Sequence, residues 1–231
     1  MMQAMLVARV TLRELWVTFR LVLLLAAFIG GSAVATLLPG ASTTLLDRLA
    51  ALLAVATAIS AALAAWTMAA NRTAGRAGWL VSRSVTRHGY LAGRVCGGAG
   101  GGVFGAAAAM LLGWLAALSL PVPPAAPVLA AALLAAVGAV LAAIAIGMAV
   151  GALLQPLPSA IVAGILVAAG WFAIATAGTL LAGGALSVPS IGRMLAAPTA
   201  CADALRFAGA ALLTAALALT LAGVASDRAE L

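Results

Sequence analysis

The densest group of side chains that could do chemistry lies in one polar stretch, residues 71–96, with the sequence NRTAGRAGWLVSRSVTRHGYLAGRVC. It holds the single histidine of the chain, His88, and five of its twelve basic residues. These five are Arg72, Arg76, Arg83, Arg87 and Arg94. One histidine without a neighbouring acid or nucleophile makes no catalytic cluster, so we interpret His88 as a solvated loop residue. Long apolar runs flank the stretch, and we expect it to lie in water on the cytosolic side.

Other chemistry is sparse. All twelve basic residues are arginine, and a phosphate-binding loop of the Walker type needs a lysine, so we expect no ATP site in this chain. Cys96 and Cys201 have no metal-ligand spacing and are too few for a disulfide scaffold. No charged residue lies in the middle of an apolar run, which argues against an ion- or proton-driven transporter. The sequence therefore predicts neither an enzyme nor a cofactor in this chain.

The composition indicates an integral membrane protein of the all-α class. Of 231 residues, 66% are hydrophobic and 7% are charged, whereas soluble domains have about 25% charged residues. The net charge of +7 is not accompanied by a basic face that alternates with aromatic residues. We therefore attribute this charge to membrane topology and expect no nucleic-acid partner.

Residues 2–19 are predicted to form an amphipathic helix that lies on the membrane. At 100° per residue one sector is apolar and a neighbouring sector is basic. The apolar sector holds Met5, Leu12, Leu15, Trp16 and Phe19, and the basic sector holds Arg9, Arg13 and Arg20. In the alternative interpretation this segment is only the start of the first spanning helix. The Ala33-Val34-Ala35 motif resembles a signal-peptide cleavage site, but the apolar run around it is long enough to span.

Six transmembrane helices are expected after this segment. They are residues 21–38, 49–70, 95–120, 128–154, 160–181 and 207–225. Asp47 and Arg48 belong to a short loop, residues 71–94 form the cytoplasmic loop, and residues 183–206 form a broken outer segment that is re-entrant or interfacial.

The arginines predict the orientation. Nine lie on the side of the N-terminus: Arg9, Arg13, Arg20, Arg72, Arg76, Arg83, Arg87, Arg94 and Arg228. The other three are Arg48, Arg193 and Arg206. By the positive-inside rule both termini should be cytoplasmic, in a multi-pass protein of a bacterial-type inner membrane in contact with membrane lipids.

Glycine pairs with GxxxG spacing predict close helix packing without naming the partner helix. They are Gly97–Gly101, Gly98–Gly102, Gly101–Gly105 and Gly147–Gly151.

Residues 73–97 resemble the first cytoplasmic loop of ABC-2 type transporter permeases. That loop has a glycine, then a proline-valine-serine-arginine element, then a leucine-glycine-lysine at the start of the third helix. Gly75 matches the glycine, Ser84–Arg87 the second element, and Leu91 with Gly93-Arg94 the third. The chain departs from the pattern in two respects: the acidic residues around the glycine are missing, and a serine replaces the proline.

The resemblance implies that the loop forms a coupling helix, which docks on a separate cytosolic ATPase subunit that binds ATP and Mg²⁺. It also implies a second permease copy or a paralogue, and export as the direction of transport. The predicted ATPase contacts are Gly75, Arg76, Trp79, Leu80, Val81, Arg83, Val85 and Arg87. Independently of the resemblance, apolar residues set among arginines in a cytosolic loop suit a protein partner. The alternative is a loop whose arginines only fix the topology.

Two other functions fit the same pattern. One is a haem-export-like membrane subunit of cytochrome c maturation, and the other is an accessory subunit of a larger membrane complex that transports nothing itself. The alanine-rich spans suit lipids, amphiphiles and drugs equally as substrates.

Overall fold

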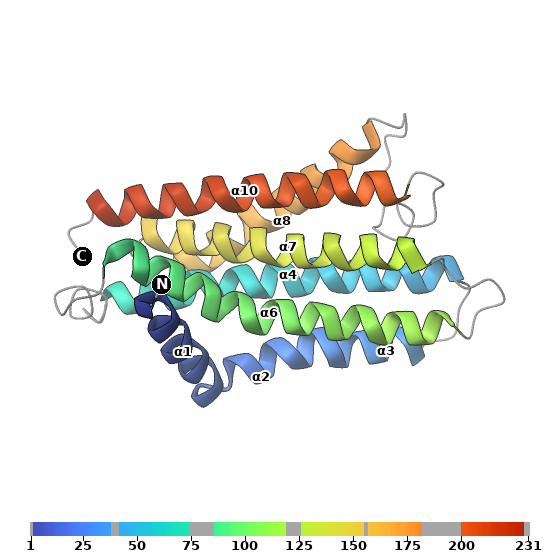
Figure 1. The fold of residues 1–231 in the computed structure, drawn as a ribbon, viewed down its shortest axis with the longest axis horizontal. Coiled ribbons are helices and arrows are strands. Elements are labelled where there is room, and N and C mark those ends of the chain that lie inside the picture. The colour runs from blue at the N-terminus through green and yellow to red at the C-terminus, as the bar shows by residue number, and fades with distance from the viewer. Residues whose placement is uncertain are drawn as a thin grey trace.

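The computed structural model describes residues 2–37, 42–73, 86–118, 126–154, 157–181 and 200–228, and every element within these ranges is helical. The helices run along one long axis and alternate in direction, except the first, which is strongly tilted (Figure 1). Their bounds are α1 Met2–Val17, α2 Arg20–Leu25, the π-helical turn η1 Ala26–Gly30, α3 Gly31–Leu37, α4 Ser42–Thr73, α6 Arg87–Ala117, α7 Ala126–Leu153, α8 Leu157–Leu181 and α10 Ala200–Arg228.

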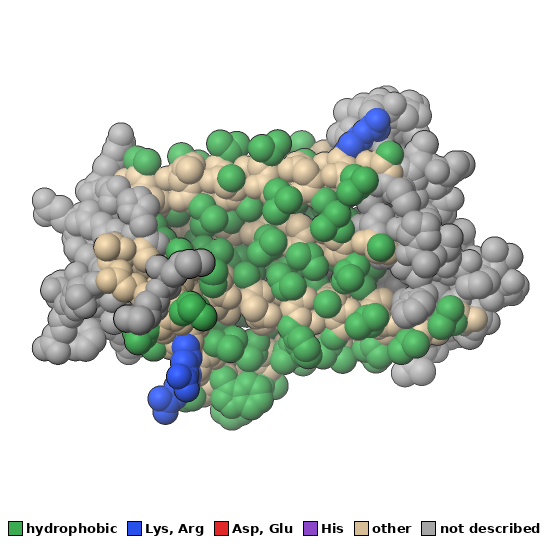
Figure 2. Space-filling view, in the orientation of Figure 1, with side chains coloured by type: hydrophobic (Ala, Val, Ile, Leu, Met, Phe, Trp, Pro, Cys, Tyr) green, Lys and Arg blue, Asp and Glu red, His purple; other side chains and the backbone are tan. Residues whose placement is uncertain are grey.

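Five helices are long and apolar enough to cross a membrane. The apolar segments are Ala54–Asn71, Gly89–Gly113, Leu133–Leu153, Leu157–Ala175 and Leu205–Ala225. The shortest has 18 residues, and at a rise of about 1.5 Å per residue it covers most of a hydrocarbon core of about 30 Å. Hydrophobic side chains cover the face of the bundle in Figure 2. The all-α prediction is confirmed for the described residues, and these apolar helices support the prediction of a membrane protein.

Several helices begin earlier than the apolar runs predicted. Helix α4 starts at Ser42 and includes Asp47 and Arg48, which the sequence had suggested lie in a loop. Helix α6 starts at Arg87, within the predicted loop 71–94, and α10 starts at Ala200, within the predicted outer segment. Alanine, leucine and arginine are strong helix formers, so the helices continue past the apolar runs that hydropathy detects. Residues 74–85 and 182–199 lie outside the described part of the chain.

Helix α7 is the centre of the bundle. Its apolar segment is 72% buried, against 17% for that of α8. The predicted Gly147–Gly151 pair packs on α4: a Cβ atom at Gly151 would lie 3.0 Å from the Cα atom of Ala65. Gly102 of α6 faces α7 in the same way, because a Cβ atom there would lie 2.7 Å from Val140. The close packing predicted from the glycine pairs is therefore present, and the structure identifies the partner helices.

Helices α8 and α10 contact each other through aromatic side chains. The Trp171 indole Nε1 donates a hydrogen bond of 2.8 Å to the Thr214 hydroxyl. The ring of Phe207 lies 5.8 Å from that of Trp171 and 6.0 Å from that of Phe172, centroid to centroid. Phe207 is fully buried, so this cluster anchors the first turns of α10.

Helix α1 leaves the bundle at a sharp corner. Its axis makes an angle of 79° with the segment that begins at Arg20. The corner residue is Phe19, which has a left-handed backbone conformation with φ 57°. Such a conformation is uncommon for a residue with a side chain, and it gives the chain its change of direction in a single step.

Candidate functional site

The first turns of α6 lie directly against α1, at the end of the bundle where the predicted cytoplasmic loop begins and ends. Two glycines of α6 permit this approach. A Cβ atom at Gly93 would lie 2.7 Å from the carbonyl oxygen of Ala4, and one at Gly97 would lie 2.7 Å from Cβ of Thr11. No side chain fits at either position without a shift. We call this contact the α1–α6 interface; it consists of Ala4, Val7, Ala8, Thr11, Glu14, Tyr90, Gly93, Arg94 and Gly97.

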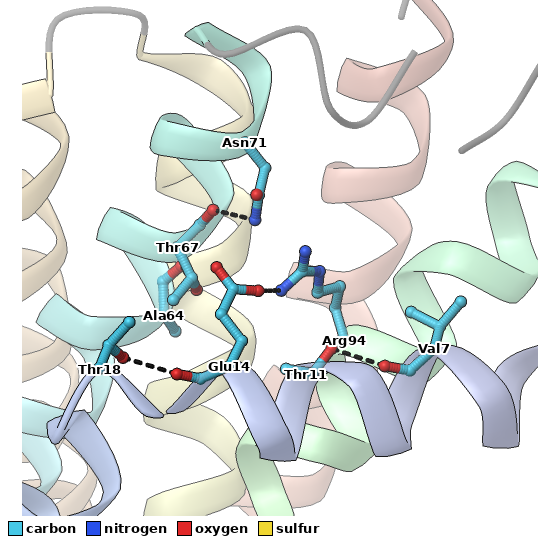
Figure 3. A network of polar contacts seen from close by, with 8 residues as sticks. All are labelled: Val7, Thr11, Glu14, Thr18, Ala64, Thr67, Asn71 and Arg94. Atoms are coloured by element: carbon cyan, nitrogen blue, oxygen red, sulfur yellow. Dashed lines mark hydrogen bonds and ion pairs between the residues drawn. The ribbon is translucent and has the colours of Figure 1, made fainter. Parts of the chain in front are cut away.

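A partly buried ion pair crosses the α1–α6 interface. The Nη1 atom of Arg94 donates to Oε2 of Glu14 at 2.7 Å (Figure 3). The side chain of Arg94 is 5% exposed and that of Glu14 is 24% exposed. The sequence had placed Arg94 in water at the edge of the cytoplasmic loop, and this was wrong. Helix α6 begins seven residues before Arg94, so the guanidinium points into the bundle, where a partner offsets the cost of burying its charge.

The other polar side chains near the ion pair mostly bond to their own helices. The Thr11 hydroxyl donates to the Val7 carbonyl at 2.8 Å, and the Asn71 amide nitrogen donates to the Thr67 carbonyl at 2.6 Å (Figure 3). Asn71, at the other end of the predicted aqueous stretch, is also buried. These bonds satisfy buried groups without joining helices, so the ion pair is the strong polar link between α1 and α6 in the described part of the chain.

Two buried polar atoms beside the ion pair have no hydrogen-bond partner in the described structure. They are the hydroxyl oxygen of Tyr90 and the Nε atom of Arg94. The guanidinium carbon of Arg94 lies 5.4 Å from the centroid of the Tyr90 ring, which is within cation–π range. Buried polar atoms are normally hydrogen-bonded, so Tyr90 and Arg94, which contact each other here, form the least well satisfied part of the α1–α6 interface.

The start of α1 also contacts the residue that precedes α6. The backbone nitrogen and hydroxyl of Thr86 lie 3.4 Å and 3.5 Å from Oε1 of Gln3. Such long contacts are weak, but with the ion pair they connect both halves of α1 to the segment that leaves the loop.

The predicted interfacial residues occupy the outer side of α1. Arg9 and Arg13 are exposed, as are the side chains of Trp16 (61%) and Phe19 (69%). Arg20 is half-buried, with its guanidinium carbon 4.0 Å from the centroid of the Trp66 ring. Leu15 differs from the prediction: it is buried against the bundle with Val7 and Thr11. The helix thus has two apolar sides, one against protein and one outward, which a single amphipathic sector did not anticipate.

The predicted ATPase contacts lie almost entirely outside the described residues. These are Gly75, Arg76, Trp79, Leu80, Val81, Arg83 and Val85. Arg87 is the first residue of α6, and its side chain is not described. The described ends of this segment, Thr73 of α4 and Thr86, lie at the same end of the bundle as α1 (Figure 1).

The sequence interpretation missed Glu14, Tyr90 and Asn71. A usable signal existed for Glu14, which is one of only five acidic residues in the chain and lies within a helix otherwise rich in arginine and apolar residues. The glycine row also extended one step further than predicted, to Gly93. Small residues four apart on both segments would have indicated that α1 packs on the start of α6.

Comparison with protein-family models, with curated proteins and with solved structures gave no match. In the described residues, no three histidine, cysteine or acidic side chains are grouped as metal ligands would be. The site is therefore characterised by its own geometry: the tilted helix α1 and its ion pair with α6, next to the ends of the two long helices that flank residues 74–85.

Proposed function

We propose that this chain is the membrane-spanning permease subunit of an ATP-driven transporter of the ABC-2 type. A separate cytosolic ATPase subunit supplies the energy, and the substrate is a hydrophobic or amphipathic molecule that is exported. The transporter contains two permease subunits, either two copies of this chain or this chain with a paralogue. This proposal rests on the sequence of residues 74–85 and on the position of the described residues that flank them.

The observation that carries the proposal is the attachment of α1 to the first turns of α6. Residues 74–85 directly precede Thr86. The residues of α6 that begin the α1–α6 interface lie within two helical turns of Thr86. A partner that moves this loop would therefore move α6 and α1 together, because Gly93, Gly97 and the Arg94–Glu14 pair hold them in contact. Energy from a cytosolic subunit thus has a direct route into the bundle.

We further propose six transmembrane segments, with α1 as an interfacial helix. The 79° corner means that α1 does not continue the direction of the segment after it. Residues 20–37 form an almost continuous helical segment of 18 residues, about 27 Å long at 1.5 Å per residue, which is close to the hydrocarbon thickness. This segment is the sixth span, in addition to the five helices that are long and apolar enough to cross a membrane.

Both termini are cytoplasmic in this proposal. Removing the buried Arg94 from the nine arginines on the N-terminal side leaves eight against three, which retains a strong positive-inside bias. The start of α10, with the exposed Arg206, lies at the opposite end from α1 (Figure 1). In a cysteine-free background, Arg206→Cys should react with a membrane-impermeant thiol reagent on intact cells; reaction only after lysis would reverse the orientation.

The decisive experiment changes the apolar residues of the loop. The double variant Trp79→Ala/Leu80→Ala should remain inserted and folded but lose ATPase copurification. Truncating a buried interface anchor costs about 2 kcal/mol or more, a factor of about 30 in affinity. Substrate export should fall in parallel, because the ATPase no longer drives the bundle.

The matched control is Leu213→Ala/Leu217→Ala, which removes a similar apolar area from exposed positions of α10. It should leave ATPase association unchanged. Normal ATPase association and export in the loop variant would contradict the proposal. Stoichiometric purification with a non-ATPase complex would instead indicate an accessory subunit, and purification with haem-handling proteins would indicate the haem-export-like role.

A further inference from the structure

A groove lies between the first turns of α6 and the last turns of α10. Both helices pack along α7, but they contact each other over a short stretch only. The volume of the groove is about 680 Å³, within the range of about 300–1,000 Å³ that is usual for small-molecule sites. The lining residues are Leu91, Ala92, Val95, Cys96, Leu219, Thr220, Gly223 and Val224.

Small residues make this groove. A Cβ atom at Gly223 would meet nothing within 4 Å, and the exposed side chain of Ala92 on the opposite wall is a single methyl group. Further along α10 the outward residues are large instead: Leu212, Leu213 and Leu217 are all exposed. The groove is therefore a local feature of the place where α6 meets α10, and the rest of the outer face of α10 is a ridge of leucines.

The lining suits an uncharged ligand. Within the described part of the chain no charged side chain lines the groove, because Arg94, on the same turns of α6, is buried against α1 in its ion pair. The Thr220 hydroxyl donates its proton to the Leu217 carbonyl at 2.7 Å, and the thiol of Cys96 is only a weak donor. A charged group would lose hydration here without gaining a partner, whereas an alkyl chain would lose nothing.

The groove lies at one end of the apolar helices. Its α6 residues are among the first eight of the apolar segment Gly89–Gly113, and its α10 residues are among the last seven of Leu205–Ala225. At a rise of about 1.5 Å per residue they lie within about 12 Å of the segment ends, which is the outer part of a hydrocarbon core of about 30 Å. These ends lie on the α1 side of the bundle (Figure 1). In a bilayer, phospholipid acyl chains fill this depth.

We propose that this groove binds one acyl chain of a membrane phospholipid, from the leaflet on the α1 side of the bundle. The chain lies between α6 and α10 against Leu91, Val95 and Leu219, and its headgroup stays beyond the apolar segments. Two helix walls give the chain more atom contacts than one convex helix face does, and each contact adds to the dispersion attraction. The site requires no ATPase partner, so it holds or fails independently of the proposed transport function.

The experiment uses the full chain in phosphatidylcholine vesicles that contain a small fraction of phosphatidylcholine with a photoreactive diazirine in one acyl chain. After illumination, the crosslinked residues are identified and quantified by mass spectrometry. Crosslinks should concentrate on residues 91–96 and 219–224 and be fewer on the equally exposed residues 212–217. Gly223→Leu fills the groove from α10 and should reduce crosslinking to residues 91–96 of α6. A chain that loses about ten atom contacts loses about fivefold in occupancy.

The matched control is Gly209→Leu on the same helix. A Cβ atom at Gly209 also meets nothing within 4 Å, but Gly209 does not line the groove. Crosslinking to residues 91–96 should therefore stay at the wild-type level in this variant. Thermal unfolding of both variants confirms that they are folded to the same extent.

A second pair of variants tests the opposite wall. Ala92→Leu fills the groove from α6 and should reduce crosslinking to residues 219–224 of α10. Its control is Gly100→Leu, an exposed position of α6 outside the groove where a Cβ atom meets nothing within 4 Å. Equal losses in the filling variants and their controls would overturn the proposal, as would crosslinks spread evenly over the groove and residues 212–217. A disulfide between the Cys96 residues of two copies, formed under mild oxidation in a Cys201→Ser background while the lipid crosslinks are absent, would overturn it in favour of a second copy of this chain.

Discussion

The first and last helices attach to the bundle by contacts of different kinds. Helix α1 meets α6 through glycines, a partly buried ion pair and polar side chains. Helix α10 packs along α7 through alanines and Gly138, where a Cβ atom would lie 3.2 Å from Cβ of Ala211. The two contacts differ because the two helices run in different directions relative to their neighbours. A helix that runs alongside its neighbours packs against them over many turns, whereas a helix crossing at a steep angle touches over few turns and depends more on a specific polar contact to fix its position.

The largest effect is expected from breaking the ion pair. Glu14→Ala leaves the buried Arg94 charge without its partner and should destabilise the protein by about 3 kcal/mol, the lower end of the range for buried pairs, since Glu14 is partly exposed. The unfolding free energy in detergent, measured by denaturant titration, checks this.

The double variant Glu14→Leu/Arg94→Met tests whether the destabilisation of Glu14→Ala comes from the unpaired charge of Arg94. Replacing both charges by apolar groups should recover much of the loss, because no charge is then left buried alone. If Glu14→Ala and wild type unfold at the same free energy, the pair contributes nothing to holding α1.

The next largest effect is expected from replacing a glycine at the α1–α6 interface, compared with replacing a glycine of α10. Gly97→Ala places a methyl group within 2.8 Å of the Ala8 carbonyl oxygen and should destabilise by about 1–3 kcal/mol through overpacking. Gly209→Ala in α10 meets nothing within 4 Å and should stabilise its helix by about 0.5–1 kcal/mol. The same unfolding titration compares them, and a loss of equal size in both would remove the distinction between the regions.

A smaller effect is expected for the polar contact of the C-terminal region. Thr214→Val removes the acceptor of the Trp171 hydrogen bond, and interhelical hydrogen bonds in membranes average about 0.6 kcal/mol. Trp171 fluorescence should shift as its indole loses the bond. A loss as large as that of Glu14→Ala would show that α10 also depends on a polar link.

The smallest effect is expected on the outward face of α10. Leu213 is 69% exposed, and Leu213→Ala should change the unfolding free energy by no more than about 0.5 kcal/mol, as at other sites without buried contacts. A larger destabilisation would reveal that this face is covered by another helix, for example from a second permease subunit.

The sequence interpretation succeeded where a property depends on neighbours along the chain. Apolar runs predicted the helices that are long enough to span, and glycine spacing predicted close packing at Gly102 and Gly147. It failed at positions set by contacts across space. Arg94 and Glu14 are 80 residues apart, and Arg94 was interpreted as aqueous because its sequence neighbours are polar. Leu15 was interpreted as outward because its apolar neighbours on the helix are outward.

Composition alone determined that this chain is a helical membrane protein. A chain with 66% hydrophobic residues must satisfy its backbone hydrogen bonds internally in lipid, and helices do so within one segment. Only the tertiary structure decided where the buried charges pair and which helices the glycines face. Those outcomes depend on the 79° corner at Phe19, because the direction of α1 brings Glu14 to Arg94.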